Sequence, residues 1–364
     1  PTTVDELEQV LIAFRDNADK IQEECGVEGD VIPMSFIINN GDQDPAILIN
    51  GFGEGYGDTA DHFAVTDEGE VIYTTVQEGY KEGIEWLHKL VEEDLVDPEA
   101  FTQEWSTYVA KGKNHRYGLC FTWDIANIDN YDDYVMLPAL AGPDGLVNIT
   151  RQNNSETSGF ERGRCVLTTS CKDTALAAAW IDQMYAPLQS VQNNWGTYGE
   201  EGKPNIFEMS TNAEGGEMLK HEDLGDNSPV EVRESQSVNG PLAVLNDYYD
   251  VYVTQPDDAK WRLDNMHATY LDDMHSQYVY PNVFMSIDDT NKVSQYDTDI
   301  KKYAEQKKAD WILNGGIEEE WDSYLKKMED YGLSDYLAIK QKYFDQYQES
   351  LTQENTAATQ DTQS

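Results

Sequence analysis

Trp123 and Asp124 are the residues of this sequence best suited to recognising a small polar ligand. They directly follow Tyr117–Phe121, an apolar run that predicts a β-strand. In open α/β sheets, ligands bind beyond the carboxyl ends of the strands. An indole face covers the apolar C–H face of a sugar ring, and a carboxylate accepts hydrogen bonds from its hydroxyls. We therefore predict that both residues contact a ligand, with an ordinary core or rim tryptophan as the alternative.

A second polar segment, residues 39–44, also follows a predicted strand, Val31–Ile38. Its amides and carboxylates can both donate to and accept from hydroxyl groups. A solvated turn is the alternative interpretation. A glycine-rich stretch follows, in which two aromatic residues are predicted to form a wall next to the loop. The predicted ligand-binding residues of this region are Asn39, Asn40, Gln43, Asp44, Phe52 and Tyr56.

A third group of candidates lies in residues 151–202, and those at 151–154 again follow a predicted strand. The predicted ligand-binding residues here are Arg151, Asn153, Trp195 and Tyr198.

Catalytic and metal-binding motifs are weak. The six histidines form no HExxH motif, and no GxSxG elbow occurs. With 69 acidic residues, some carboxylate pair always reaches the spacing of a glycosidase, so such a pair carries no information. The acidic run 124–133 lacks the Asp-x-Asp-x-Asp-Gly pattern of a calcium loop. We predict no catalytic residue, no metal and no cofactor.

Composition excludes some partners. The chain of 364 residues carries 25 Lys and Arg against 69 Asp and Glu, a net charge of −44. Nucleic acids and anionic membranes both require cationic surface, so neither is an expected partner. Mutual repulsion favours a monomer, and a neutral solute suits this background best. No apolar run is long enough to span a membrane. The four cysteines show no CxxC spacing, and Cys120 and Cys165 are predicted to be buried thiols.

Strands alternating with helices predict α/β architecture over the first 200 residues. The pattern predicts a hairpin of residues 63–65 and 71–73, helices over 77–94, 103–110 and 173–185, and strands over 134–140 and 164–168. Residues 208–240 show no hydrophobic periodicity, which predicts a long irregular surface segment. Helix is predicted almost without break from Pro241, followed by a disordered tail in 352–364.

The helical end of the chain has clear boundaries. Gly315 and Gly316 end one helix, and Glu318–Glu320 fill the first turn of the next, where carboxylates meet the positive end of the helix dipole. Trp311 and Trp321 lie on apolar stripes and are predicted to be core residues, as are Trp105 and Trp180.

Several segments together resemble one family. They are PTTVDELEQVLIAF (1–14), GYKEGIEWLHKLVEEDLVDPEAF (79–101), KGKNHRYGLCFTWD (111–124), YVMLPALAGPDG (134–145) and the helical segment from Trp311 onward. In this order they are similar to the extracellular solute-binding proteins (family 1 type) of carbohydrate ABC importers. The match covers nearly the whole chain, but about a third of the family's length, including its signal peptide, would precede Pro1.

The resemblance implies a two-lobed periplasmic-binding-protein-like α/β fold (type II). Residues 1–130 and 205–350 would form a nearly complete, helix-rich C-terminal lobe, and residues 131–204 part of the N-terminal lobe, with a disordered tail over 351–364. It implies that Trp123 lies in the cleft, that Asp44 matches a carboxylate preceding a proline, and that Trp195 and Tyr198 lie near the hinge.

The implied function is extracellular capture of a carbohydrate, an oligosaccharide, by hinge closure and its delivery to membrane permease subunits. The protein would be a cell-surface lipoprotein of a Gram-positive-type bacterium and not an enzyme. Two alternatives stay open. One is an exported glycoside hydrolase or lyase acting on oligosaccharides, and the other is a surface interaction module without a small-molecule site.

Overall fold

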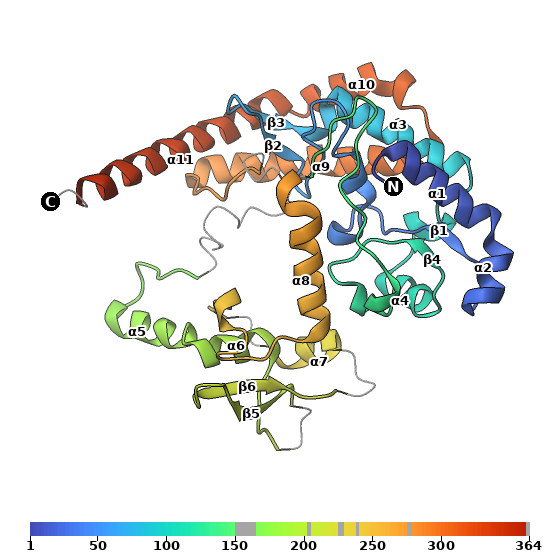
Figure 1. Ribbon diagram of the computed structural model, residues 1–364. Coiled ribbons are helices and arrows are strands. Elements are labelled where there is room, and N and C mark those ends of the chain that lie inside the picture. The colour runs from blue at the N-terminus through green and yellow to red at the C-terminus, as the bar shows by residue number, and fades with distance from the viewer. Residues whose placement is uncertain (150–164, 202–204, 225–228, 238–239, 275–278, 362–364) are drawn as a thin grey trace. The chain divides into compact units, whose positions relative to one another are not determined.

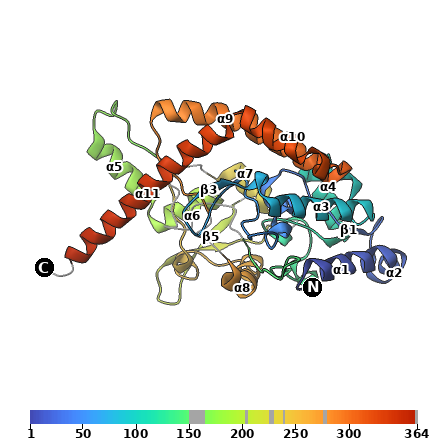
Figure 2. The same ribbon diagram turned by 90° about the horizontal axis from the view of Figure 1, so that it is seen from above.

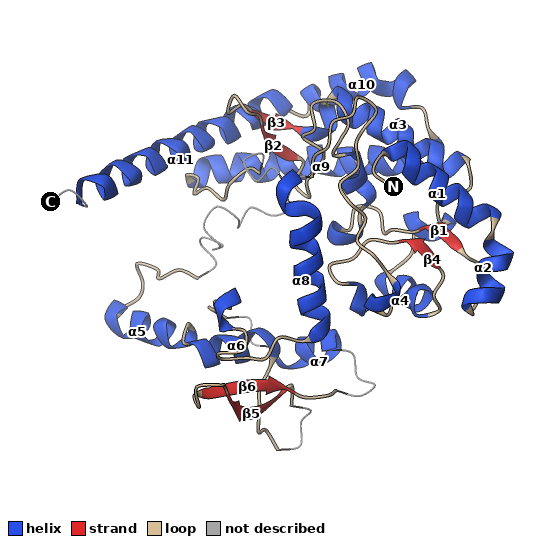
Figure 3. Cartoon of the chain, viewed as in Figure 1, coloured by secondary structure: helices blue, strands red, loops and turns tan. Residues whose placement is uncertain are grey.

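The computed structural model describes residues 1–149, 165–201, 205–224, 229–237, 240–274 and 279–361. Helices dominate, and the strands are short (Figure 3), so the architecture is helix-rich α/β. The chain divides into two compact units. The first comprises residues 1–160 and 266–364, and the second comprises residues 161–265. The predicted lobe boundaries at 130/131 and 204/205 stay a prediction.

The first unit opens with α1 (Val4–Asp16) and α2 (Ala18–Cys25). Thr3 caps α1, because its hydroxyl oxygen accepts a hydrogen bond from the Glu6 N–H at 3.1 Å. The Glu6 carboxylate reaches back to the Thr2 N–H at 2.7 Å. One face of α1 is buried through Val4, Leu7 and Leu11, as the helical spacing of these apolar residues requires.

Two parallel strands set the geometry of this unit. β1 (Ile32–Met34) pairs with β4 (Tyr117–Leu119), with Ile32 opposite Tyr117 and Met34 opposite Leu119. Because the strands are parallel, the chain leaves both of them at the same edge of the sheet. The predicted hairpin is confirmed as β2 (Phe63–Val65) and β3 (Val71–Tyr73), joined by a turn at residues 66–70.

The remaining elements of the first unit are helical. They are α3 (Glu78–Glu92), α4 (Trp105–Lys113), α9 (Ile287–Asn314), α10 (Ile317–Asp330) and α11 (Leu333–Asp361). α9 packs against α3 and against α11, and both views show these helices as neighbours (Figures 1 and 2). The tail predicted to be disordered overlaps the end of α11, which continues to Asp361.

Glycine ends α9 where the sequence predicts. Gly315 and Gly316 have φ of 74° and 89°, a region that side chains with a Cβ rarely enter. A Cβ at Gly315 would also lie 2.5 Å from His88 Nε2. Across this turn Trp311 of α9 packs edge-on against Tyr324 of α10 with ring centroids 4.8 Å apart, and Trp321 stacks on Tyr324 at 5.6 Å. The predicted core positions of both tryptophans are confirmed, since they are 1% and 5% exposed.

The second unit contains α5 (Thr174–Met184), α6 (Pro187–Trp195), α7 (Pro229–Gln236) and an antiparallel hairpin of β5 (Phe207–Thr211) and β6 (Glu217–His221). It also contains the first part of α8 (Asp257–Tyr270). Its core is a separate apolar cluster that includes Val191, Phe207, Leu219 and Val253. The predicted irregular surface segment over 208–240 is therefore wrong. Charged residues occur on both faces of this hairpin, since Glu217 shares a face with buried Leu219, and they hide its apolar alternation.

Three other predictions are also wrong. Residues 134–140 and 165–168 form no strand, because an apolar run becomes a strand only beside a partner strand. Helix does not continue from Pro241, since residues 241–256 are irregular apart from the short 3₁₀-helix Asn246–Tyr248. Cys165 is exposed and not buried.

α5 is apolar but unburied. Leu176 is 68% exposed and Trp180 61% exposed, and the helix has no buried residue. The predicted core position of Trp180 is therefore wrong in this chain, and Trp105 on α4 is also 38% exposed. Periodicity identifies an apolar face, but the presence of a packing partner decides whether that face is buried.

Burial gives a direct stability test. Trp311→Ala should lower the free energy of unfolding by about 3–5 kcal/mol, because it leaves a cavity in the aromatic cluster. Trp180→Ala, which removes the same side chain from an exposed position, should change it by no more than about 0.5 kcal/mol. Urea titration followed by circular dichroism measures both. Equal losses in the two variants would contradict this assignment of the core.

Candidate functional site

The loops that follow β1 and β4 carry the predicted ligand-binding residues of the first unit. They leave the same edge of the parallel pair, which is where ligands bind in open sheets. Trp123 follows β4 and is 58% exposed, so its indole is accessible to a ligand. Asp124 is only 9% exposed, and its carboxylate accepts a hydrogen bond from the Ala126 N–H at 3.0 Å. Asp124 therefore caps the short 3₁₀-helix Ile125–Asn127.

The loop 39–44 is compact. Residues Gly41–Gln43 form a 3₁₀ turn, and the Ile37 N–H donates to the Gln43 carbonyl at 3.0 Å. Asn39 and Asn40 are exposed, and Gln43 is half-buried. The structure thus brings this polar loop and Trp123 to one edge of the β1–β4 pair, although they are about 80 residues apart in the sequence.

Asp44 is engaged inside the protein. Its Oδ1 and Oδ2 lie 3.0 and 2.9 Å from Lys308 Nζ on α9. Oδ2 also accepts from the Asn39 N–H at 2.6 Å, and Oδ1 accepts from the Ala46 N–H at 2.9 Å. Sequence reasoning missed Lys308, because a lysine 264 residues away carries no local signal.

Lys308 belongs to a buried network with a second carboxylate, Asp58, whose Oδ2 lies 3.9 Å from Lys308 Nζ. Asp58 Oδ1 lies 2.8 Å from His62 Nδ1 and accepts a hydrogen bond from the Thr74 hydroxyl. Burial opposes ionisation of Asp58, but His62 and Lys308 outweigh it and hold the pKa of Asp58 below its usual value. Burial likewise opposes the charge of Lys308, and Asp44 and Asp58 outweigh it and raise the pKa of Lys308.

Phe52 and Tyr56 occupy different environments. Phe52 is 3% exposed and packs against Trp86 with ring centroids 5.7 Å apart, so its side chain belongs to the core. Tyr56 is half-buried. Phe52 and Tyr56 therefore do not form the exposed aromatic wall that the sequence predicted, because the glycine-rich segment folds inward at Phe52. Whether either residue contacts a ligand stays a prediction.

In the second unit, Trp195 ends α6 and is half-buried. Its ring lies edge-on to Phe207 and His221, with centroids 6.3 and 5.7 Å away. Burial lowers the pKa of His221 to about 4, so this histidine is neutral near pH 7. Tyr198 is 37% exposed. Arg151 and Asn153 lie outside the described residues, so the structure does not place them.

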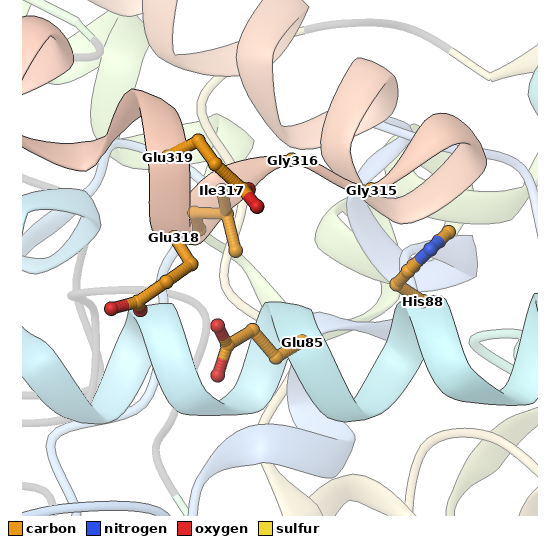
Figure 4. A pocket seen from close by; sticks show the side chains of 7 residues that line it. All are labelled: Glu85, His88, Gly315, Gly316, Ile317, Glu318 and Glu319. Carbon is orange, nitrogen blue, oxygen red and sulfur yellow. The ribbon is translucent and has the colours of Figure 1, made fainter.

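A small cavity of about 280 Å³ lies at the turn between α9 and α10, facing α3 (Figure 4). None of the predicted ligand-binding residues lines it. Three of its side chains are carboxylates, and burial and the charge of Glu318 raise the pKa of Glu85. The cavity is lined by Glu85, His88, Gly315, Gly316, Ile317, Glu318 and Glu319.

One cluster in the described part of the chain has the composition of a metal site. His115, Asp129 and Asp133 place ligand atoms within 4.8 Å of one another. Asp129 accepts hydrogen bonds from the Tyr134 hydroxyl at 3.1 Å and the Asn130 N–H at 2.8 Å, and its Oδ1 lies 2.9 Å from His115 Nδ1. These contacts account for the cluster by ordinary hydrogen bonding. The acidic run noted in the sequence contains both aspartates but not His115.

None of the helices within the described residues is long and apolar enough to cross a membrane.

No protein-family model matches the chain. The chain nevertheless belongs to the substrate-binding proteins of ABC transporters, because relatives of this class match it in both sequence and fold. It is 46% identical over 349 residues to the fructooligosaccharide ABC transporter substrate-binding protein FusA of Streptococcus pneumoniae, across 96% of this chain and 63% of that protein. The solved structure of S. pneumoniae FusA in complex with kestose matches with a TM-score of 0.82 and 45% identity, over 96% of this chain and 69% of that one.

A more distant structure supports the fold alone. It is an HMO-binding, ABC-transporter-associated solute-binding protein from Bifidobacterium longum infantis, with a TM-score of 0.72 and 22% identity, covering 95% of this chain and 70% of that one. The chain thus spans somewhat less than two thirds of the length of the curated relative that it matches. The resemblance inferred from the sequence is confirmed at the level of family, and the relatives are substrate-binding proteins rather than enzymes.

The environment of His221 gives a pH prediction for the second unit. Its folded pKa of about 4 lies below the ordinary value of 6.5, so the unfolded chain takes up the proton first as the pH falls. The stability that neutral His221 provides is therefore present above pH 6.5 and is lost as the pH falls towards 4, by up to roughly 3 kcal/mol.

Hydrogen exchange of the β5 and β6 amides, corrected for intrinsic rates and compared near pH 7 and near pH 5, measures this loss. His221→Asn should make protection less sensitive to pH. His267→Asn, on the exposed face of α8, is the control and should keep the wild-type dependence. A dependence that persists in His221→Asn would assign the effect to other groups.

Proposed function

We propose that this chain captures a fructo-oligosaccharide for an ABC importer. The observation that supports it best is the exposed Trp123 at the carboxyl edge of β1 and β4, the edge that also carries the loop 39–44. The ligand class comes from the relationship to FusA, whose solved structure holds kestose. Such a ligand is neutral, which suits a chain with a net charge of −44.

The chemistry of sugars predicts a different contact for each of the proposed ligand-binding residues. The indole of Trp123 covers a C–H face of a sugar ring, and side-chain amides of Asn40 and Gln43 pair with hydroxyls. Asp124 and Asp44 hold neighbouring backbone in place through their caps and ion pair. The ligand roles of Tyr56, Trp195, Tyr198, Arg151 and Asn153 are part of the same proposal.

The proposed mechanism is closure of two lobes around the sugar, in the type II periplasmic-binding-protein manner. Solute that binds the closed form more tightly shifts the population towards that form. The closed form then docks on the membrane permease subunits. We propose that the protein works outside the cell as a monomeric lipoprotein. No bond in the sugar is made or broken.

Ligand binding tests the proposal directly. Kestose should raise the melting temperature of the 364-residue chain in a concentration-dependent way, because a ligand that binds only the folded state stabilises it. Maltotriose, a glucose oligomer of the same length, serves as the matched control. New reducing ends after incubation with kestose would instead favour the hydrolase alternative. A chain that responds to neither sugar would contradict the proposed ligand class.

Trp123 is the side chain to remove. Trp123→Ala should weaken kestose binding by about 2–4 kcal/mol in titration calorimetry, as expected for a central stacking residue. Trp105→Ala removes a partly exposed indole from α4 and should leave the affinity within about 0.5 kcal/mol of wild type. An unchanged affinity in Trp123→Ala would remove this residue from the site.

A further inference from the structure

Lys308 occupies an unusual position for a lysine in a chain with so few cations. It lies on α9 and is 4% exposed, with its ammonium group between the carboxylates of Asp44 and Asp58. Taking a lysine and two carboxylates out of water is costly, and apolar residues of similar size often stabilise a core equally well. Stability alone therefore does not explain this network, and its contacts indicate that it positions a loop.

The contacts run from α9 into the loop 39–44. Lys308 fixes both oxygens of Asp44, and Asp44 Oδ2 accepts the Asn39 N–H at 2.6 Å. Asn39 has φ of 55°, a left-handed conformation that is uncommon for a residue other than glycine. Its backbone thus adopts a disfavoured shape that the Asp44 carboxylate stabilises.

A second tether comes from the same helix. Asn39 Nδ2 donates to the Glu305 carbonyl of α9 at 3.1 Å. Glu305 and Lys308 are three residues apart, so they lie on the same face of α9. The first and last residues of the loop are therefore both held by one face of α9, which leaves Asn40 and Gln43 between two fixed ends.

We propose that Lys308 is a positioning residue for ligand binding. Through Asp44 it holds the loop 39–44 in the shape that presents Asn40 and Gln43 at the edge where Trp123 lies. This inference rests on the proposed function for its ligand, but the tether itself is a property of the unliganded protein. A loop that is already ordered loses less entropy when the sugar binds, so the tether raises affinity without touching the ligand.

The test separates loop order from fold stability. Lys308→Met/Asp44→Asn removes the tether without leaving the Asp44 charge unpaired, and Asp44→Asn alone keeps an acceptor for the Ala46 N–H. Lys307→Met is the matched control. It removes the same charge from the preceding residue of α9, where the ammonium pairs with Glu320 and Asp310 instead of with Asp44.

Hydrogen exchange without ligand is the first readout. The amides of residues 39–44 should exchange roughly tenfold faster or more in both tether variants, while amides in the middle of α9 keep their protection and Lys307→Met behaves as wild type. Kestose affinity is the second readout and should fall roughly tenfold or more in the tether variants only.

Unchanged exchange of the loop in a folded tether variant would overturn the proposal. Faster loop exchange with unchanged kestose affinity would also overturn it, because the loop would then be irrelevant to binding. If wild-type protein does not bind kestose, the proposed function fails, and the exchange readout still decides whether Lys308 orders the loop.

Discussion

The buried ion network around Lys308 is the interaction on which the first unit depends most. One ammonium group of α9 lies beside Asp44, the last residue of the loop 39–44, and beside Asp58, which precedes β2. Breaking such a buried pair on one side typically costs about 3–5 kcal/mol, because it leaves an uncompensated charge. A helix close to the C-terminus thereby fixes loops from the first 60 residues of the chain. The same unit uses a second buried lysine in this way, since Lys111 Nζ lies 2.6 Å from Asp97 Oδ2.

The acidic composition determines where such buried ion pairs can form. With 69 acidic residues and 25 Lys and Arg, most carboxylates have no cation to pair with and must face water. The buried lysines are therefore concentrated where two or more acidic groups converge. The net charge of −44 is consistent with the neutral ligand and the monomeric state proposed above. It does not by itself distinguish a sugar from other neutral solutes, which is why the relationship to FusA supports the proposed ligand class.

The edge formed by β1 and β4 shows how a modest amount of regular structure can position the residues of the proposed ligand site. Each strand has three residues, but their parallel pairing brings together two loops that are far apart in the chain. One loop supplies an exposed indole and the other supplies amides. Caps from Asp124 and Asp44 stabilise the short 3₁₀-helices that follow, so these two carboxylates hold backbone, while Asn40 and Asp42 of the loop are exposed.

The sequence alone determined those features that depend on local chemistry. Glycine at 315 and 316, the Thr3 cap, the β2–β3 hairpin and the stripes that bury Trp311 and Trp321 all follow from side chains within a few residues of one another. The order of short segments was also sufficient to indicate the family. Tertiary structure decided everything that depends on a distant partner. It buried Phe52, left Trp180 on an uncovered helix, made a hairpin of the acidic segment after residue 206, and placed Lys308 on Asp44. The physical reason is that burial and ion pairing each require two groups in contact, and a local stretch of sequence contains only one of the two.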